Sequence, residues 1–254
     1  MVYAPRDRVR TLARSAFPRR RARLVMVRDA AACAAAFRTM LVDAAVVDVG
    51  AATDETWRVA GLAREFPSAP FFGVTPLRAG DGPALARCAG LDFAELLVEG
   101  VDDGVVRDLV TRRAFSARFA AVLGEPPTAL GLTTELQRLT WKHVVASAGR
   151  AVRTESIALG VGVSREHLSR TFAAGTAPNL KRVIDLVRLM AAAELAKNPG
   201  YDVRDVARVL GFASSSHLGS TAQRVVGTKP ASLARLRTAD LVERFVHGRG
   251  RSRG

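Results

Sequence analysis

The sequence predicts an α/β domain built on a parallel sheet, followed by an all-α domain that contains two helix-turn-helix units. Short runs rich in Val, Phe and Leu alternate with helix-length segments in the first half, as in sheets covered by helices on both faces. Beyond the prolines at 126 and 127 the strand-like runs stop. The charge also changes, from seven basic and thirteen acidic residues over 24–110 to twenty basic and nine acidic residues over 129–254.

The elements of the first half follow from local composition. An amphipathic helix comes first, and its apolar face is expected to hold Val9, Leu12, Ala13, Ala16 and Phe17. Strands are expected at 23–27, 44–50, 70–76 and 92–98. Helices are expected at 29–41, 54–66 and 82–90, with one long final helix at 102–124. The glycine and the two prolines within 124–127 then end the domain, because consecutive prolines cannot continue a helix.

This order of elements resembles a two-component receiver domain, which has the flavodoxin-like doubly wound fold. Asp48 ends one strand where a receiver carries its phosphoacceptor, and Thr75 ends the next where a receiver carries Ser or Thr. The chain is expected to depart from the receiver pattern, because it starts too late to supply a first strand and an acidic pair for Mg²⁺. The lysine of the fifth strand is also missing, since residues 92–100 contain none.

Those departures bear on the role of Asp48. Phosphoryl transfer to a carboxylate needs a divalent cation to neutralise the developing charge. Asp48 is therefore retained as a candidate phosphoacceptor against a competing interpretation, in which it is a strand-end or helix-cap residue of a degenerate, receiver-like interaction domain.

The second half carries two similar helical devices. After an amphipathic helix at 135–152, whose inner side is expected to hold Leu136, Leu139, His143 or Val144, and Ala148, a short helix capped by Thr154 leads to a turn at Gly162. Ser164 caps the next helix, which turns Leu168 and Phe172 inward. This helix, glycine turn and helix form the pattern of a helix-turn-helix unit.

The pattern recurs over residues 202–230. Val203, Val206, Ala207 and Leu210 give the first helix an apolar face, Gly211 ends it, and the serines at 214–216 cap the next helix. Between the two units, residues 179–198 predict one helix of about 18 residues, which spans roughly 27 Å. Two reading helices on such a spacer suit successive major grooves, whose repeat is about 34 Å.

The block from 131 to 237 resembles the DNA-binding domain of the AraC/XylS family of transcription regulators. The matching landmarks are IALGVGVSREHLSRTF, RLMAAAEL, DVRDVARVLGFASSSHL and GTKPASLAR. The resemblance implies that the groove-facing residues of the first recognition helix are Arg165, Glu166, Ser169 and Arg170. Among them Arg170 is the expected base reader, because a guanidinium can contact guanine O6 and N7 together.

The corresponding positions of the second recognition helix are Ser215, Ser216, Gly219 and Ser220. His217 lies beside them and is either a phosphate contact or a solvent-exposed side chain. The family usually has Arg where this chain has Ser220, and Phe where it has Ala222. The second unit is therefore expected to position the protein on DNA, and the first unit is expected to determine the sequence specificity. The wider phosphate contacts are expected at Arg165, Arg182, Arg224 and Lys229.

These observations together predict a cytoplasmic transcription regulator that is not an enzyme and needs no cofactor or metal. Cys33 and Cys88 lie in apolar stretches and are expected to be reduced core residues. No apolar run approaches the roughly 18 residues of a membrane span. The basic tail 247–254 is expected to add sequence-independent attraction to DNA.

The expected organisation is a receiver-like domain with a basic leader at 1–123, a linker at 124–130, an AraC-type domain at 131–237 and a helical extension with a basic tail at 238–254. The expected partners are double-stranded DNA, a second copy of the chain, and RNA polymerase or a regulatory protein. Two other functions stay open. One is an interaction adaptor with residual non-specific DNA binding, and the less favoured one is a phospho-relay protein that uses Asp48.

Overall fold

The computed structural model describes residues 1–20 and 22–248, which form two compact units. The first unit comprises Met1–Arg118 together with Asn198–Gly200, and the second comprises Phe119–Lys197 together with residues 201–248. Residues 249–254, which make up most of the basic tail expected from the sequence, lie outside the described residues.

A five-stranded parallel sheet forms the centre of the first unit. Its strands are β1 (Val2–Tyr3), β2 (Met26–Val27), β3 (Ala45–Asp48), β4 (Phe71–Thr75) and β5 (Glu95–Val98). They lie in the order β2-β1-β3-β4-β5, and every neighbouring pair is parallel. This is the strand order of flavodoxin-like doubly wound folds, so the receiver-like fold class predicted from the sequence is confirmed.

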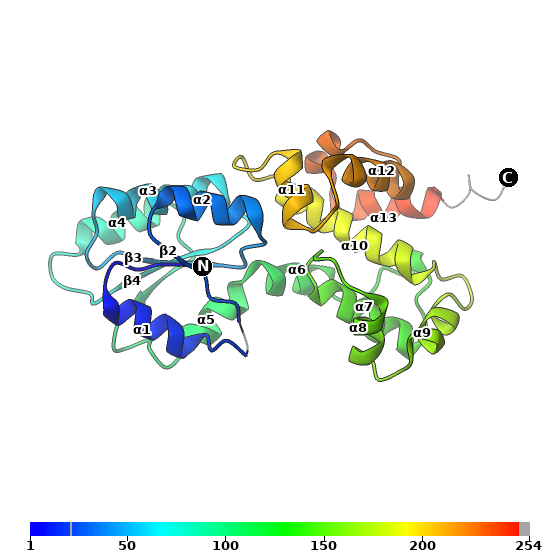
Figure 1. Ribbon diagram of the computed structural model, residues 1–254, viewed down its shortest axis with the longest axis horizontal. Helices are drawn as coiled ribbons and strands as arrows, with labels where there is room; N and C mark the ends of the chain where they lie inside the picture. The colour runs from blue at the N-terminus through cyan, green and yellow to red at the C-terminus, as the bar shows by residue number, and fades with distance from the viewer. Residues whose placement is uncertain (21, 249–254) are drawn as a thin grey trace. The chain divides into compact units, whose positions relative to one another are not determined.

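Helices cover both faces of this sheet (Figure 1). One face carries α1 (Asp7–Ala16) and α5 (Val106–Arg113), and the other carries α2 (Ala30–Thr39), α3 (Asp54–Glu65) and α4 (Gly82–Gly90). On the α1 side, Val9, Val46 and Val110 belong to one buried apolar cluster. On the opposite side the rings of Phe37 and Phe66 stack with their centroids 4.2 Å apart.

The expectation that the chain lacks a first strand is wrong. Val2 and Tyr3 form β1 between β2 and β3, where Val2 is in register with Met26 on one side and Val46 on the other. A strand of two residues is too short for hydrophobic alternation to reveal it. Only the hydrogen bonds with both neighbouring strands identify it.

The long helix expected at 102–124 is also wrong in part, because the structure divides it into α5 and α6 (Phe115–Leu123). Ala114 between them has an extended backbone, with ψ 146°. The freed amide of Phe115 donates to the Asp43 carbonyl oxygen at 2.8 Å, and the amide of Ser116 donates to the Asp43 carboxylate at 3.1 Å. The break is therefore fixed by hydrogen bonds to a residue more than seventy positions earlier, which local helix propensity does not reveal.

Every regular element in the described part of the second unit is a helix. Its elements are η1 (Thr128–Leu130), α7 (Glu135–Ala146), α8 (Thr154–Gly160), α9 (Arg165–Phe172), α10 (Leu180–Leu195), α11 (Val203–Val209), α12 (Ser215–Val226), η2 (Pro230–Arg235) and α13 (Thr238–His247). The α10 helix lies between the α8 and α9 pair and the α11 and α12 pair (Figure 1). It has 16 residues, which gives it a length of about 24 Å. No described helix of the protein is long and apolar enough to cross a membrane.

The helix expected at 135–152 ends at Ala146, and its expected inner side is confirmed only in part, at Val144 and Ala148, which are buried. Leu139 was expected to point inward, but 43% of its surface is exposed. The buried face contains Trp141 instead, whose indole N–H donates to the Gly124 carbonyl oxygen at 3.0 Å, and Gln137, whose amide donates to the Phe172 carbonyl oxygen at 2.8 Å. Apolar periodicity did not place Gln137 on the buried face, because this core position is held by a polar side chain that satisfies backbone carbonyl groups.

Candidate functional site

The two helix-turn-helix units close their first helices in the same way. Gly162 and Gly211 follow α8 and α11 with φ of 73° and 70°, a conformation that favours glycine. The next amide in each unit reaches back five residues, from Val163 to the Ala158 carbonyl oxygen at 3.0 Å and from Phe212 to the Ala207 carbonyl oxygen at 2.8 Å. These are Schellman-type ends, which turn the chain sharply toward the next helix.

Serines cap both recognition helices, as the sequence predicts. The hydroxyl of Ser164 accepts the amide hydrogen of His167 at 3.1 Å, and that of Ser214 accepts the amide hydrogen of His217 at 3.0 Å. The predicted cap at Thr154 is wrong, because Thr154 is the first helical residue of α8 and no side chain caps this helix. The two caps fix where the recognition helices begin, with α9 starting at Arg165 and α12 at Ser215.

Burial separates the two sides of α9. Leu168 and Phe172 are fully buried, whereas all four predicted groove-facing residues are exposed. The exposed residues are Arg165, Glu166, Ser169 and Arg170. Arg165 forms an ion pair with Glu155 of α8 at 3.0 Å. Core packing thus turns a polar row of α9 away from the protein.

The outer side of α12 is less strongly charged. Ser216 and Ser220 are exposed, Ser215 is half-buried, and the Ser220 hydroxyl donates to the His217 carbonyl oxygen at 3.1 Å. Gly219 faces η2, since a Cβ atom built on it would lie 3.4 Å from the Pro230 side chain. Of the predicted positions on α12, the structure therefore leaves mainly small hydroxyl groups on the exposed surface.

Gln223 is an exposed residue of α12 that the sequence analysis missed. It lies three residues after Ser220 and seven after Ser216, a spacing that places all three on one side of a helix. Continuing the helical spacing of Ser216 and Ser220 into the next turn of the helix would have identified Gln223.

Three of the four wider phosphate-contact candidates make contacts within the protein, and the first of them is the ion pair of Arg165 with Glu155. The Arg224 guanidinium donates to the Asp185 carboxylate of α10 at 2.9 Å. The Arg182 guanidinium lies over the Phe245 ring of α13, with 5.0 Å between its central carbon and the ring centroid. Lys229 is exposed. Arg182 and Arg224 thus tie α10 to neighbouring helices, whatever they contact outside the protein.

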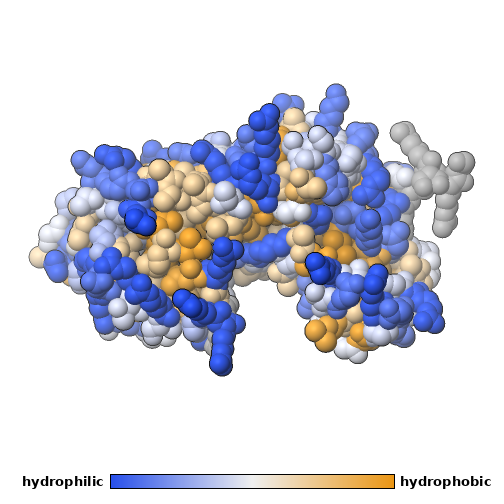
Figure 2. Space-filling model, viewed as in Figure 1, coloured by the Kyte–Doolittle hydropathy of each residue, from blue (hydrophilic) through white to orange (hydrophobic). Residues whose placement is uncertain are grey.

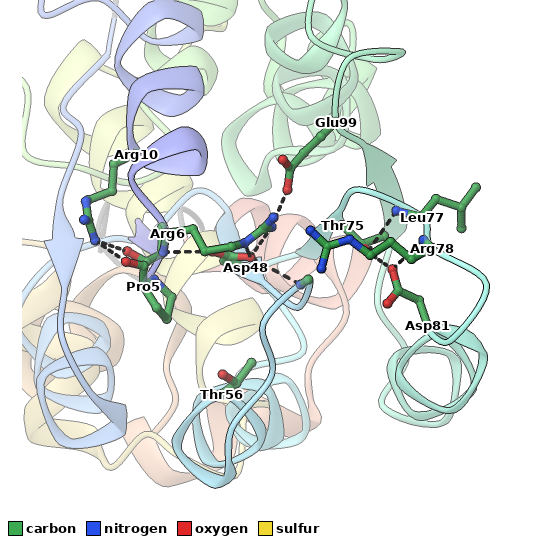
Figure 3. Close-up of polar contacts among 12 residues, drawn as sticks. Pro5, Arg6, Arg10, Asp48, Thr56, Thr75, Leu77, Arg78, Asp81 and Glu99 are labelled. Carbon is green, nitrogen blue, oxygen red and sulfur yellow. Dashed lines mark hydrogen bonds and ion pairs between the residues drawn. The ribbon is translucent and has the colours of Figure 1, made fainter.

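A second polar cluster lies at the carboxyl edge of the sheet in the first unit (Figure 3). Asp48 is 0% exposed, and its carboxylate accepts hydrogen bonds from the Arg6 side-chain Nε at 2.9 and 3.0 Å and from the Arg6 amide at 3.2 Å. The amide of Gly50 donates to the same carboxylate at 3.3 Å. Arg6 also forms an ion pair with Glu99, so residues that follow β1 and β5 meet at the end of β3.

The charges of this cluster support one another. Partial burial tends to lower the pKa of Arg6, but the hydrogen bonds and negative charges of Asp48 and Glu99 raise it above its ordinary value overall. A guanidinium that is always charged suits a buried carboxylate, because both can align two hydrogen bonds in one plane. The site is therefore an arginine-centred structural cluster.

The hydroxyl of Thr75 points to a different partner. Thr75 is buried, and its hydroxyl donates to the Asp81 carboxylate just before α4 at 2.6 Å (Figure 3). The hydroxyl oxygen accepts the amide hydrogen of Leu77 at 3.2 Å. The hydrogen bond from Thr75 is the main reason that the pKa of Asp81 is lowered, and the Arg78 amide adds to it.

The receiver-like fold implies Mg²⁺ beside Asp48, and the residues present do not fit it. Mg²⁺ prefers an octahedral shell of oxygen atoms from carboxylates, phosphates and water. Arg6 brings a fixed positive charge into contact with both Asp48 and Glu99. A divalent cation that bound the Asp48 carboxylate would be repelled by the positively charged Arg6 guanidinium, which already contacts that carboxylate.

Residues 157–235 match a family model described as a helix-turn-helix domain. This segment is an AraC-type helix-turn-helix domain. The match begins within α8 and ends with η2, so it includes both recognition helices and the α10 spacer. The family resemblance predicted from the sequence is confirmed for this part of the chain, and with it a DNA-binding role in transcription regulation.

Two further comparisons complete these findings. No curated protein matches the chain. A crystal structure of full-length FixJ from B. japonicum matches with a TM-score of 0.38 and 15% sequence identity, over 78% of this chain and 95% of that one. The family model thus identifies the AraC-type domain, and the strand order of the sheet identifies the fold class of the first unit.

Proposed function

We propose that this protein is a sequence-specific transcription regulator whose AraC-type domain reads DNA bases through α9 and positions itself on the duplex through α12. One observation carries the proposal: core packing leaves the polar row of α9 exposed, on a helix whose N-terminus projects from a capped turn. Hydrophilic side chains also cover much of the face of both units drawn in Figure 2. Helices presented in this way enter the major groove in helix-turn-helix proteins.

The difference between the two recognition helices supports a division of labour. On α9, Arg170 is exposed and forms no ion pair among the described residues, so its guanidinium is available for a guanine edge. On α12 the predicted groove-facing residues that are exposed, Ser216 and Ser220, carry only hydroxyl groups, and that of Ser220 already donates to its own helix. Such side chains contact phosphates well and discriminate bases poorly.

The first unit supplies dimerisation or a surface for a partner protein in this proposal. Its sequence beyond the basic leader carries an excess of acidic residues, in contrast to the basic second half. Its sheet edge is occupied by Arg6, Asp48 and Glu99, which favours a fixed interaction domain over a phosphorylated one. RNA polymerase or another regulatory protein remains a proposed partner.

The proposal is tested by selecting bound fragments from genomic DNA in the presence of competitor DNA. The full-length protein should retain specific fragments, and Arg170→Ala should weaken their binding by about 1–3 kcal/mol and relax selection at one base position. Arg244→Ala removes an exposed arginine of α13 outside the recognition helices and serves as the matched control. Unchanged base selection in Arg170→Ala would remove the role given to this residue.

The small side chains of α12 favour one alternative, an interaction adaptor that binds DNA without reading it. This protein would bind all fragments alike, and its affinity would fall steeply with salt for every sequence. A preference for particular fragments of a thousandfold or more excludes the adaptor, because specific complexes exceed non-specific ones by about that factor.

A further inference from the structure

The spacer helix α10 carries a charged residue that is almost completely buried. Arg188 is 9% exposed, and its terminal Nη2 donates to the Leu210 carbonyl oxygen at 3.1 Å. Its guanidinium carbon lies 3.8 Å from the centroid of the Phe212 ring. Leu210 and Phe212 flank Gly211, so one side chain of α10 contacts the residues on both sides of the turn between α11 and α12.

Phe212 in turn contacts His217, an exposed residue of the second recognition helix. The Phe212 ring, whose other neighbour is Arg188, meets the ring of His217 edge-on, with centroids 5.6 Å apart and planes at 77°. His217 lies in the first turn of α12, and its Nδ1 accepts the Ala213 amide hydrogen at 3.4 Å. The orientation of an exposed ring thus depends on a stack that begins in the core.

We propose that Arg188 is the positioning residue of the second recognition helix, because it fixes the turn before α12 and, through Phe212, the direction of the His217 ring toward DNA. This inference rests on the proposed function and adds to it the residue that holds α12 in place. Arg188 itself touches no DNA in this arrangement, since it is buried.

The chemistry explains why an arginine occupies this position. The last carbonyl groups of a helix lack partners within the helix, and a positive charge there is favourable. A planar guanidinium can donate to such a carbonyl while it stacks on an aromatic ring, which a lysine ammonium cannot reproduce. The Nε of Arg188 is buried without a hydrogen-bond partner, so this residue is not an optimal choice for core stability alone.

A second contact holds α12 to the same part of α10. Asp185 lies one turn before Arg188 and accepts the hydrogen bond from Arg224 of α12 described above. The negative charge of Asp185 also partly offsets the burial that lowers the pKa of Arg188. One contact holds the turn before α12 and the other holds the last turns of α12, so α10 sets the direction of this helix.

The first test measures DNA binding by the full-length protein on a fragment from the selection described above. A wild-type footprint is expected over two segments, one for each recognition helix. Arg188→Met keeps the bulk of the side chain and should lose protection of the α12 segment alone, with affinity about tenfold lower.

Three further variants separate positioning from a general loss of stability. Phe212→Leu should reproduce the loss at the α12 segment, and Arg188→Lys should fail to restore it. Arg204→Met removes an exposed arginine from α11 and should keep both segments. In the double variant with His217→Ala, Arg188→Met should cost less than it does alone, because both changes remove the same contact.

The second test needs no DNA and therefore distinguishes the two proposals. In the free protein, the NMR signal of the His217 ring should move toward that of an unstacked histidine in Arg188→Met and stay in place in Arg204→Met. A His217 signal that does not move in Arg188→Met, or a footprint that keeps both segments, overturns the inference. Wild-type protein without base preference refutes the proposed function, and the NMR result still decides the role of Arg188.

Discussion

The cluster at the edge of the sheet gives a sharp prediction about stability. Replacing Arg6 by Met removes a guanidinium that contacts both Asp48 and Glu99. The Asp48 carboxylate is fully buried and would keep only two backbone donors, the amide of residue 6 at 3.2 Å and the amide of Gly50 at 3.3 Å. A buried carboxylate without its positive partner is strongly unfavourable.

The expected size follows from the exposure of the two partners. Removing one member of a fully buried ion pair costs about 3–5 kcal/mol. The side chain of Arg6 is 22% exposed, so water screens part of the charge, and the first unit should lose about 2–3 kcal/mol of unfolding free energy. Changing Asp48 to Asn in the same protein should recover part of this loss, because the uncompensated charge disappears.

The assay is urea unfolding followed by tryptophan fluorescence at pH 7. The chain has two tryptophans, and a Trp141→Phe background leaves Trp57 of α3 to report on the first unit alone. Arg8→Met is the matched control, because Arg8 pairs with Asp103 at an exposed position and should cost less than about 1 kcal/mol. An Arg6→Met protein within about 0.5 kcal/mol of wild type would refute the reasoning about the buried pair.

Three more predictions concern groups in the first unit. Burial raises the pKa of Cys33 to about 12 and that of Cys88 to about 11, so neither thiol should react rapidly with a thiol reagent at pH 8 until urea unfolds the protein. Because the pKa of Asp81 is lowered from 3.8, its contribution to stability should be complete above that pH and fade as the pH falls through the lowered pKa; Thr75→Val should raise this pKa in an NMR titration. A small-molecule phosphodonor should leave Asp48 unmodified by mass spectrometry, and incorporation that Asp48→Asn abolishes would contradict this.

Much of the fold was predictable because its signals are local. The strands that contain Val46 and Phe72 are continuous apolar runs, and Gly162 and Gly211 mark turns that favour a positive φ. Serine caps placed the starts of α9 and α12, since a hydroxyl acceptor two or three residues before free amides has a clear sequence pattern. Burial of Leu168 followed from helical periodicity.

The candidate site was predictable only in part for the same reason. Periodicity placed the exposed row of α9 correctly, but it did not show that Arg224 pairs with Asp185 or that Arg182 stacks on Phe245. These pairs join residues 39 or more positions apart, and no local pattern selects one such partner among many. The role of Arg188 was hidden likewise, because a charged residue inside a helix usually indicates a solvated side.

By itself, the sequence determined the class of both units, the two glycine turns, and the exposed polar row that includes Arg170, because each depends on residues within a few positions of one another. The tertiary structure decided that Val2 and Tyr3 form a central strand, that Arg6 neutralises Asp48, and that α10 holds the second turn. Those features depend on which distant groups meet in a space that excludes water. In that space β1 pairs with strands on both sides, and Arg188 is buried in the core.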